Sequence, residues 1–370
     1  MTYFKKIVIL VFLFPILLHS TIVSAQEIDM FGPKYIKEIL LKVSNWQLTH
    51  SNNKQENDWT NGAFYTGLFA TYQTTKSPIV LDSLLAMGER KKWLPGKRFD
   101  NADDYAISQT YIDLYRIKKE LRMIQPTLDS LQKMKTQPGK AFENHGLTWW
   151  WCDALYMAPP VLVKLAKTLK DPSYLVLNDT LYHQTYQLLY NKEEHLFARD
   201  ARYLWNEKGE GQREANGKRL FWTRGNGWVL GGLVRVLQEM PKDYANRNFY
   251  VQLYTEMCQR ILLLQQPDGL WRTSMLDPDA YPGGEGSGTG FNCYALAWGV
   301  NNKLLDRKLF LPAVKKAWIG LNTLLTPEGK LGWVQPIGGT SKRNFNAESW
   351  EAYGSGAFLL AGSELFKLKK

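Results

Sequence analysis

The stretch of sequence with the clearest chemical potential is a run of three tryptophans followed by an acid. Trp149, Trp150 and Trp151 precede Cys152 and Asp153, and a long apolar segment follows. Burial of a carboxyl group beside indole rings removes it from water, which raises its pKa. A carboxylic acid that stays protonated near neutral pH can act as a general acid. Asp153 is therefore a candidate catalytic acid, although a helix N-cap beside an aromatic core gives the same pattern.

Two further acids, Asp103 and Asp104, open another apolar segment. Acidic side chains are stabilised at helix N-termini, so this placement alone does not establish catalysis. Glycoside hydrolysis needs two carboxyl groups that face each other across a cleft. We expect Asp153 to carry the raised pKa and its partner to stay ionised. The sequence leaves open whether that partner is Asp103 or Asp104.

Other residues could bind a flat, negatively charged sugar. Arg224 lies between Trp222 and Trp228 in the sequence, and it is followed by Gly225, Asn226 and Gly227. Arginine can hold a carboxylate through two parallel hydrogen bonds, although an arginine stacked on tryptophan and paired with a structural acid is the alternative. Ser287 and Thr289 lie on a glycine-rich helix start, where backbone N–H groups can bind anions. Further aromatic candidates for sugar contacts are Trp59, Tyr65 and Trp150.

Composition favours a protein that acts on carbohydrate. The chain has 370 residues, 14 of them tryptophan, and a formal net charge of +11. Its Lys and Arg residues are scattered and do not form the basic stripe that duplex nucleic acid requires. An anionic saccharide is therefore a better expected ligand than a nucleic acid.

Known metal and cofactor motifs do not occur in the sequence. It contains no HExxH, Walker or GxSxG motif, so we expect no metal and no cofactor. Cys152, Cys258 and Cys293 are too widely spaced for a disulfide framework or a zinc site. We expect all three to be buried as small hydrophobic side chains.

The first 25 residues have the three parts of a secretory signal peptide. Lys5 and Lys6 precede an apolar run at 7–18, and small residues end at Ala25. The run is too short for a comfortable membrane span. We predict export to the periplasm or the medium, without stable membrane insertion, and a single mature domain of residues 26–370. The sequence indicates no partner protein.

Helical periodicity dominates the mature chain. Helices rich in small and aromatic residues are predicted to begin near residues 59, 103, 149, 222, 286 and 349. Amphipathic helices alternate with them, at residues 34–47, 78–92, 126–134, 173–189, 243–265 and 311–325. Residues 191–219 are predicted to be a long polar connection with a short β-ribbon. Six helical hairpins predict an all-α (α/α)6 toroid in which the small-residue helices are inside and all start at one end. The candidate residues would then converge on one funnel.

At these residues the chain resembles the unsaturated rhamnogalacturonyl hydrolases of glycoside hydrolase family 105 and the related unsaturated glucuronyl hydrolases of family 88. The matching stretches are residues 103–115, 151–159, 222–228 and 287–300, of which the second and third are the most specific. The resemblance implies an (α/α)6 barrel, with Asp153 as the catalytic acid/base and Asp103 or Asp104 as the second carboxylate. It places the substrate contacts at Trp222, Arg224 and Trp228. One departure is Arg199-Asp200, where many members have a histidine, which leaves the preferred +1 sugar open.

The reaction that the resemblance implies is hydration of a double bond. The substrate would be a lyase-generated acidic oligosaccharide, of the rhamnogalacturonan type found in pectin, with a 4,5-unsaturated uronic acid at its non-reducing end. Asp153 would protonate C4, and water activated by the same residue would add at C5. The resulting hemiketal would open and release the next sugar.

Three other functions fit the same residues less well. A conventional inverting glycosidase would place its two carboxyl groups about 6.5–9.5 Å apart. A polysaccharide lyase would need a Tyr/His or Arg base, and histidine is scarce in this chain. A non-catalytic sugar-binding toroid would keep its ligand affinity after the substitution Asp153→Asn.

Overall fold

The structure is a computed structural model that describes residues 29–136 and 146–368. The predicted signal peptide, residues 1–25, lies outside these described residues. Among the residues described, no helix combines the length and apolar character that crossing a membrane requires.

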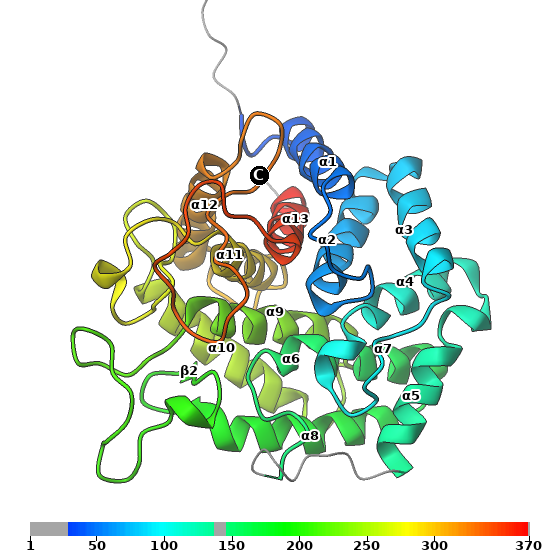
Figure 1. Cartoon of the computed structure of the whole chain (residues 1–370), viewed down its shortest axis with the longest axis horizontal. Coiled ribbons are helices and arrows are strands. Elements are labelled where there is room, and N and C mark those ends of the chain that lie inside the picture. Colours follow the sequence, from blue (N-terminus) through cyan, green and yellow to red (C-terminus); the bar gives the residue numbers. More distant parts are fainter. Residues whose placement is uncertain (1–28, 137–145, 369–370) are drawn as a thin grey trace, which may run out of the picture.

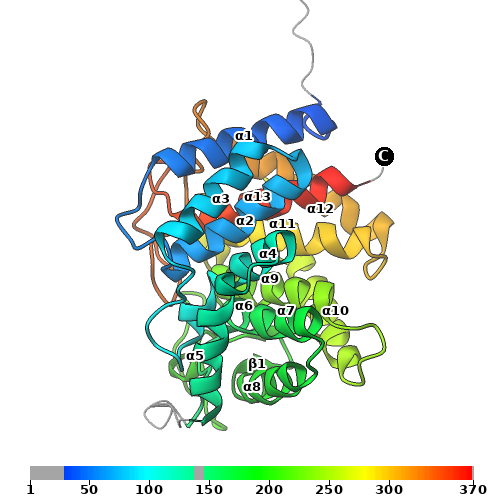
Figure 2. The ribbon, with the colours of Figure 1, turned by 90° about the vertical axis from the view of Figure 1, so that its right-hand side faces the viewer.

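The described chain forms an (α/α)6 toroid, as the sequence predicts (Figure 1). The inner helices are α2 (Trp59–Thr75), α4 (Ser108–Lys118), α6 (Ala154–Met157) continued by α7 (Pro159–Leu169), α9 (Thr223–Glu239), α11 (Gly286–Asn301) and α13 (Ala352–Lys367). The outer helices are α1 (Pro33–Thr49), α3 (Pro78–Arg90), α5 (Gln125–Thr136), α8 (Ser173–Leu189), α10 (Arg247–Leu263) and α12 (Arg307–Thr323). Each inner helix contacts the next, and α13 contacts α2, so the ring is closed. Figure 2 shows from the side that α1 lies outside α2 and α13.

Short elements complete the connections. The 3-10 turns are η1 (Ala102–Tyr105), η2 (Leu121–Met123), η4 (Ala201–Tyr203) and η5 (Pro278–Ala280). Strand β1 (Tyr190–Asn191) pairs antiparallel with β2 (Leu196–Phe197). The predicted β-ribbon therefore exists, but it lies at the very start of the long connection.

Small residues let the inner helices approach closely. A Cβ atom at Gly67 of α2 would overlap the backbone of Gly356 in α13, and a Cβ at Gly356 would overlap the backbone of α2. Glycine is required at this crossing because any side chain would push the two helices apart. The small-residue pattern thus identifies the inner ring for a steric reason.

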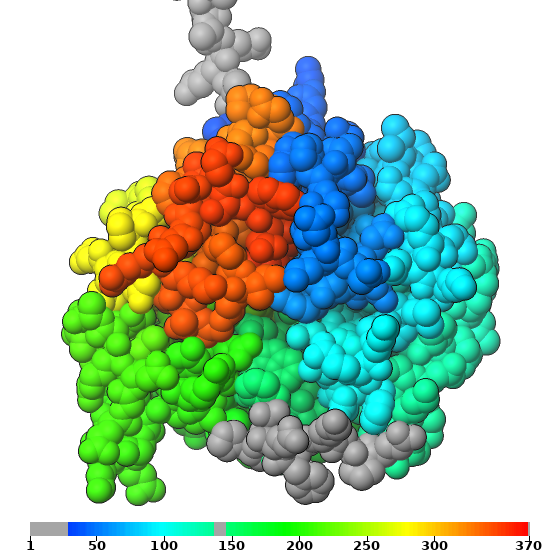
Figure 3. All heavy atoms as spheres, in the orientation of Figure 1, coloured from blue at the N-terminus to red at the C-terminus, as the bar shows by residue number. Residues whose placement is uncertain are grey.

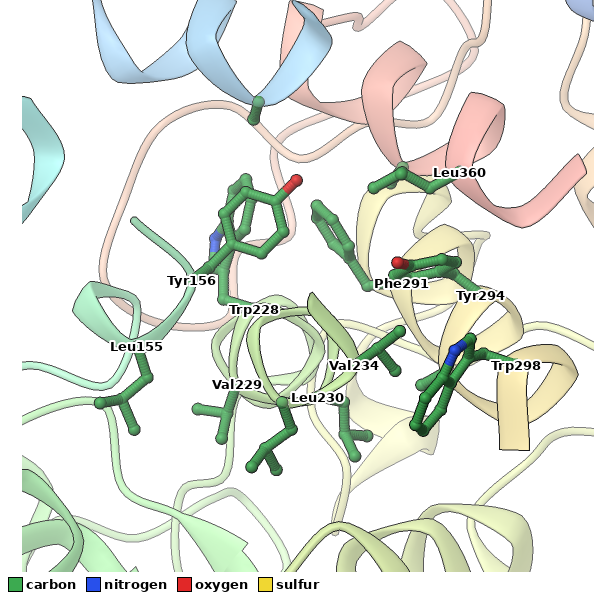
Figure 4. Packing of buried hydrophobic residues seen from close by; sticks show 14 of the residues in the cluster. Leu155, Tyr156, Trp228, Val229, Leu230, Val234, Phe291, Tyr294, Trp298 and Leu360 are labelled. Carbon is green, nitrogen blue, oxygen red and sulfur yellow. The ribbon is translucent and has the colours of Figure 1, made fainter. Parts of the chain in front are cut away.

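An aromatic cluster fills the centre of the ring. Tyr156, Trp228 and Phe291 come from three inner segments and point toward one another (Figure 4). The ring centroids of Trp228 and Phe291 are 4.4 Å apart, and those of Tyr156 and Trp228 are 4.8 Å apart. Such close aromatic contacts add to the stability gained by burial. The cluster closes the barrel and provides the floor on which a site can lie.

The helix predicted to begin near residue 149 starts later, at Ala154, and is interrupted once before it ends at Leu169. Helix α6 begins only at Ala154, and α7 begins at Pro159. Two consecutive prolines, Pro159 and Pro160, lack the N–H groups that would continue the hydrogen-bond pattern of α6, so α6 and α7 are not one continuous helix. Before α6, Trp151 forms an antiparallel bridge with Asp200. The acid that follows is thereby fixed at a junction between an extended segment and a helix.

The three cysteines are buried and unpaired, as predicted.

Candidate active site

A cavity of about 320 Å³ lies where the inner helices begin. Segments far apart in the sequence meet on this face, coloured orange, blue, cyan and green in Figure 3. The wall combines two carboxyl groups, three arginines and several tryptophans. Its residues are Trp59, Asp103, Trp151, Asp153, Met157, Arg199, Arg202, Trp222, Arg224, Trp228, Ile337, Gly338 and Gly339. The predicted convergence of helix starts on one funnel is therefore present.

Asp153 is the most buried carboxyl group of the cavity wall, with 8% of the residue exposed. It is the last residue before α6. Nε of Arg199 lies 3.3 Å from Asp153 Oδ2. Burial raises the pKa of the Asp153 carboxyl, while the charges of Arg199 and Arg224 act in the opposite direction. Asp153 thus has the environment that a general acid needs.

The structure brings Asp103, and not Asp104, to Asp153. Asp103 lines the cavity. The carboxylate of Asp104 instead accepts hydrogen bonds from the Arg98 backbone N–H and from its guanidinium, both at 2.6 Å. Burial and the nearby charge of Asp153 raise the pKa of Asp103 to about 7. The expectation that the second carboxyl stays fully ionised therefore does not hold for Asp103, because two acids share one buried site.

We predict that Asp103→Asn stabilises the folded protein at neutral pH. The Asp103 pKa is about 7 in the folded state against a usual value of 3.8. Between these values the folded state holds more protons than the unfolded state, so the free energy of unfolding of the wild type falls as pH rises. Asparagine does not ionise, so the variant should not lose this part of its free energy of unfolding as pH rises. The stability difference, measured by denaturant unfolding, should be smallest near pH 4 and largest above about pH 7. A difference independent of pH would show that the Asp103 pKa is ordinary.

Arg224 is a buried cation whose guanidinium makes no salt bridge within the described part of the chain, although the charges of Asp153 and Glu351 lie close enough to interact with it. Its guanidinium lies between Trp222 and Tyr353, 4.4 and 4.8 Å from their ring centroids. Its terminal nitrogens donate to the carbonyl oxygens of Gln335 and Pro336, and Nε is buried without a partner. A buried charge that is only partly compensated is costly. The positive charge of Arg224 is therefore available to an anion in the cavity.

Three predicted aromatic residues, Trp59, Trp222 and Trp228, line the cavity. Trp59 stacks on Tyr353 at a centroid distance of 5.4 Å. The indole N–H of Trp222 donates to Gln335 Oε1 at 3.1 Å. These contacts fix the rings, so they offer apolar faces at little cost in conformational entropy.

Four predicted contacts lie outside the cavity wall. Tyr65 donates to Glu56 at 3.3 Å, and Trp150 lies behind the wall, 5.6 Å from the Arg199 guanidinium. Thr289 accepts a hydrogen bond from the Trp271 backbone N–H. Ser287 donates to Glu285 at 2.6 Å.

The predicted anion site at the start of α11 is already filled by the protein. The Glu285 carboxylate accepts from the backbone N–H groups of Ser287 and Gly288, at 3.2 and 2.5 Å. These are the unpaired donors that would otherwise attract a ligand. The sequence reasoning was wrong here because a glycine-rich helix start does not show which carboxylate occupies it.

We predict that Glu285→Ala destabilises the protein by about 2–4 kcal/mol, since it leaves buried donors without acceptors. Glu285 is fully buried and also accepts from the Gln335 N–H at 3.3 Å. The control is Glu348→Ala, which breaks an exposed pair with Lys330 and should cost less than about 1 kcal/mol. Urea unfolding measures both. Equal effects would contradict the capping role.

Sequence reasoning missed several residues of the wall. The sequence singled out Arg199 only as a departure from the family pattern and Met157 only as part of the 151–159 match, and it assigned no role to Arg202 or to residues 337–339. The Gly338-Gly339 pair could have been noticed, because it lies in a long non-helical connection before the last helix and such connections are often functional.

Comparisons with known proteins agree with this architecture. The family model for Glycosyl Hydrolase Family 88 matches residues 34–369. A relative from Formosa agariphila, named unsaturated 3S-rhamnoglycuronyl hydrolase, is 43% identical over 362 residues, covering 94% of this chain and 96% of its own. A solved family 88 glycosyl hydrolase from Bacteroides vulgatus is 30% identical with a TM-score of 0.83, and covers 91% of this chain and 100% of its own. A solved chain named polysaccharide lyase is 33% identical with a TM-score of 0.82, covering 90% and 97%.

Proposed function

This chain belongs to glycosyl hydrolase family 88, and from that premise we propose that it removes a 4,5-unsaturated uronic acid from the non-reducing end of acidic oligosaccharides. The observation that carries this proposal is the pair of carboxyls with raised pKa values, Asp153 and Asp103, in one cavity with the Arg224 guanidinium, which has no salt bridge in the described part of the chain. Together they provide an acid, a second carboxyl and a partner for the uronate.

Asp153 is the proposed acid. Its raised pKa keeps a proton available, and transfer of this proton to C4 of the unsaturated sugar leaves positive charge at C5 and the ring oxygen. The same carboxylate then takes a proton from water as the water oxygen bonds to C5. The resulting hemiketal opens and the next sugar leaves. One residue thus serves as acid and then as base, and no covalent intermediate with the enzyme forms.

Asp103 supports this cycle because its protonation is coupled to that of Asp153. Each acid raises the cost of ionising the other, so the pair retains a proton near neutral pH. When Asp153 has delivered its proton, Asp103 with its pKa of about 7 can remain protonated beside the new carboxylate and limit the repulsion.

The substrate carboxylate is assigned to Arg224. Arg224 lines the cavity, and its guanidinium is fixed by the two aromatic rings and by the 335–336 carbonyls. Trp59 and Trp222 line the same cavity, and their rings suit the flat unsaturated sugar. A saturated uronate is not flat at C4 and C5, so it fits less well.

For the leaving sugar we propose rhamnose. The support is the word rhamnoglycuronyl in the name of the relative from Formosa agariphila. We also propose export to the periplasm or medium, in line with the three-part N-terminal sequence.

One similar structure is named a polysaccharide lyase, and elimination is the second candidate function. Elimination requires a base that removes the proton at C5. Among the described residues of the cavity wall there is neither His nor Tyr. Both aspartates have raised pKa values, so they retain protons and favour proton donation to the substrate as the first step over removal of the C5 proton.

The ultraviolet absorbance of the conjugated enol-uronate separates these functions. Hydration destroys the double bond, so absorbance should fall when the enzyme is given lyase-digested rhamnogalacturonan or other unsaturated acidic oligosaccharides. Elimination creates the double bond, so absorbance would rise on the intact polysaccharide. Release of reducing sugar from saturated oligosaccharides without any absorbance change would indicate a conventional glycosidase instead.

A further inference from the structure

The segment that follows β2 is joined to the catalytic acid through the backbone. The N–H of Cys152 donates to the carbonyl oxygen of Arg199 at 2.9 Å, and Trp151 forms a β-bridge with Asp200. Asp153 directly follows these residues. Any displacement of the 199–200 segment would therefore displace the acid.

The guanidinium of Arg199 is held from three sides. Its Nη1 donates to Asp200 at 2.7 Å, and Asp200 is only 1% exposed. The Trp150 ring lies on another side, with its centroid 5.6 Å from the guanidinium carbon. Gly339 lies so close that a Cβ atom there would be 3.3 Å from the guanidinium. These contacts leave Arg199 little freedom to move toward or away from a ligand.

The remaining contact of Arg199 is with the acid itself, Nε to Asp153 Oδ2 at 3.3 Å. A guanidinium has only donors and cannot be deprotonated in a protein. The oxygen that faces it must therefore act as an acceptor. When Asp153 is protonated, its proton is directed to the other oxygen, Oδ1. That oxygen accepts only a weak hydrogen bond from the Cys152 thiol, with Sγ at 3.8 Å, which is easily given up when Oδ1 carries the proton.

We propose that Arg199 is a positioning residue for the hydration reaction, which fixes the Asp153 carboxyl and selects Oδ1 as the oxygen that carries the transferable proton. This inference rests on the proposed function. In this proposal Trp150, Asp200 and Gly339 hold Arg199 in place. The Arg199-Asp200 pair, which departs from the family pattern, then has a role in positioning the catalytic acid.

The charges around Asp153 determine how the pH profile should respond. Burial disfavours its ionised form, while Arg199 and Arg224 favour it, and the Asp153 charge in turn raises the pKa of the neighbouring Asp103. Loss of the Arg199 charge removes one of the two cations, so the pKa of Asp153 should rise. Because the acid is active when protonated, the pH at which kcat falls on the alkaline side should move upward.

The test compares Arg199→Gln, Arg199→Lys and Gly339→Ala with wild type. Arg199→Gln should lower kcat on the order of 10²-fold. It should also raise the pH at which kcat falls on the alkaline side of the pH profile. Arg199→Lys keeps the positive charge, so the pH at which kcat falls on the alkaline side should match that of wild type. Its kcat should remain below that of wild type, since lysine lacks the fixed Nε. Gly339→Ala keeps the Arg199 charge and disturbs only the position of its guanidinium. The value of kcat should therefore fall, while the pH at which kcat falls on the alkaline side stays the same. The control is Arg122→Gln, which breaks an exposed pair with Glu89 outside the cavity wall and should change neither quantity.

A second readout does not depend on activity. A double-mutant cycle of Arg199→Gln and Asp153→Asn, followed by denaturant unfolding, should show coupling between the two sites. If wild type acts on no unsaturated substrate, the proposed function fails while the coupling can still be measured. The positioning role is overturned if the cycle shows no coupling. It is equally overturned if Arg199→Gln raises KM alone, with kcat and the pH limb unchanged, because Arg199 would then bind substrate.

Discussion

The substitution Asp153→Asn is expected to lower kcat by about 10²–10⁴-fold, the usual contribution of a general acid or base. The amide has nearly the same shape as the carboxyl and still accepts a hydrogen bond from Arg199, so the unsaturated oligosaccharide should bind with similar affinity. Asparagine has no proton of suitable acidity for C4. Because the substitution also removes a buried carboxyl, folding stability should be retained. Initial rates from the loss of ultraviolet absorbance, together with calorimetric binding, measure both effects.

The matched control for this prediction is Asp104→Asn. Asp104 is the sequence neighbour of Asp103, but its carboxylate pairs with Arg98 outside the cavity. Its substitution should change kcat less than tenfold. If Asp104→Asn were as inactive as Asp153→Asn, the assignment of Asp103 as the second carboxyl would be wrong. If Asp153→Asn kept its activity, another residue would have to supply the proton.

Arg224→Gln should reduce kcat/KM by about 30-fold or more, since loss of one partner of a buried charge pair costs roughly 2–5 kcal/mol. The substitution removes the charge that we assign to the substrate carboxylate. It also removes two donors to the 335–336 carbonyls, so part of the loss would come from a displaced loop.

A substrate with its uronate carboxylate esterified separates these two causes. Wild type should bind the ester poorly, because the anion that Arg224 recognises is gone. If Arg224 acts through the carboxylate, Arg224→Gln should lose much less activity on the ester than on the acid. An equal loss on both substrates would assign Arg224 to the support of the loop alone.

The architecture could be predicted because it depends on local patterns. The steric requirement at helix crossings puts small residues in the inner helices, and Gly67 against Gly356 is the direct example. The alternation of these helices with amphipathic ones then implies six hairpins. Exact helix starts were less accessible, since the 149–169 segment is divided by Pro159 and by a bridge between Trp151 and Asp200. That bridge joins residues far apart in the sequence, and no local pattern shows it.

The site residues could be predicted where their neighbours in the sequence also form their surroundings in the fold. Asp153 beside tryptophans and Arg224 between tryptophans are such cases, and both line the cavity. Ser287 was not predictable, because the Glu285 carboxylate that fills its helix start could equally have faced solvent. The choice between Asp103 and Asp104 depends on the direction of a single 3-10 turn, η1. The Arg199 contact depends on a fold-back of the 199–200 segment onto Cys152, which only the tertiary structure contains.

The central claim, protonation of C4 by Asp153, is tested most directly by running the reaction in deuterium oxide and locating the label by NMR. The account predicts one deuterium at C4 of the released uronic acid in a single configuration, because a fixed acid delivers it to one face. It also predicts that Asp153→Asn incorporates none at a measurable rate. A product without deuterium at C4, and with the C4=C5 double bond intact, would contradict the account and indicate cleavage at the anomeric carbon.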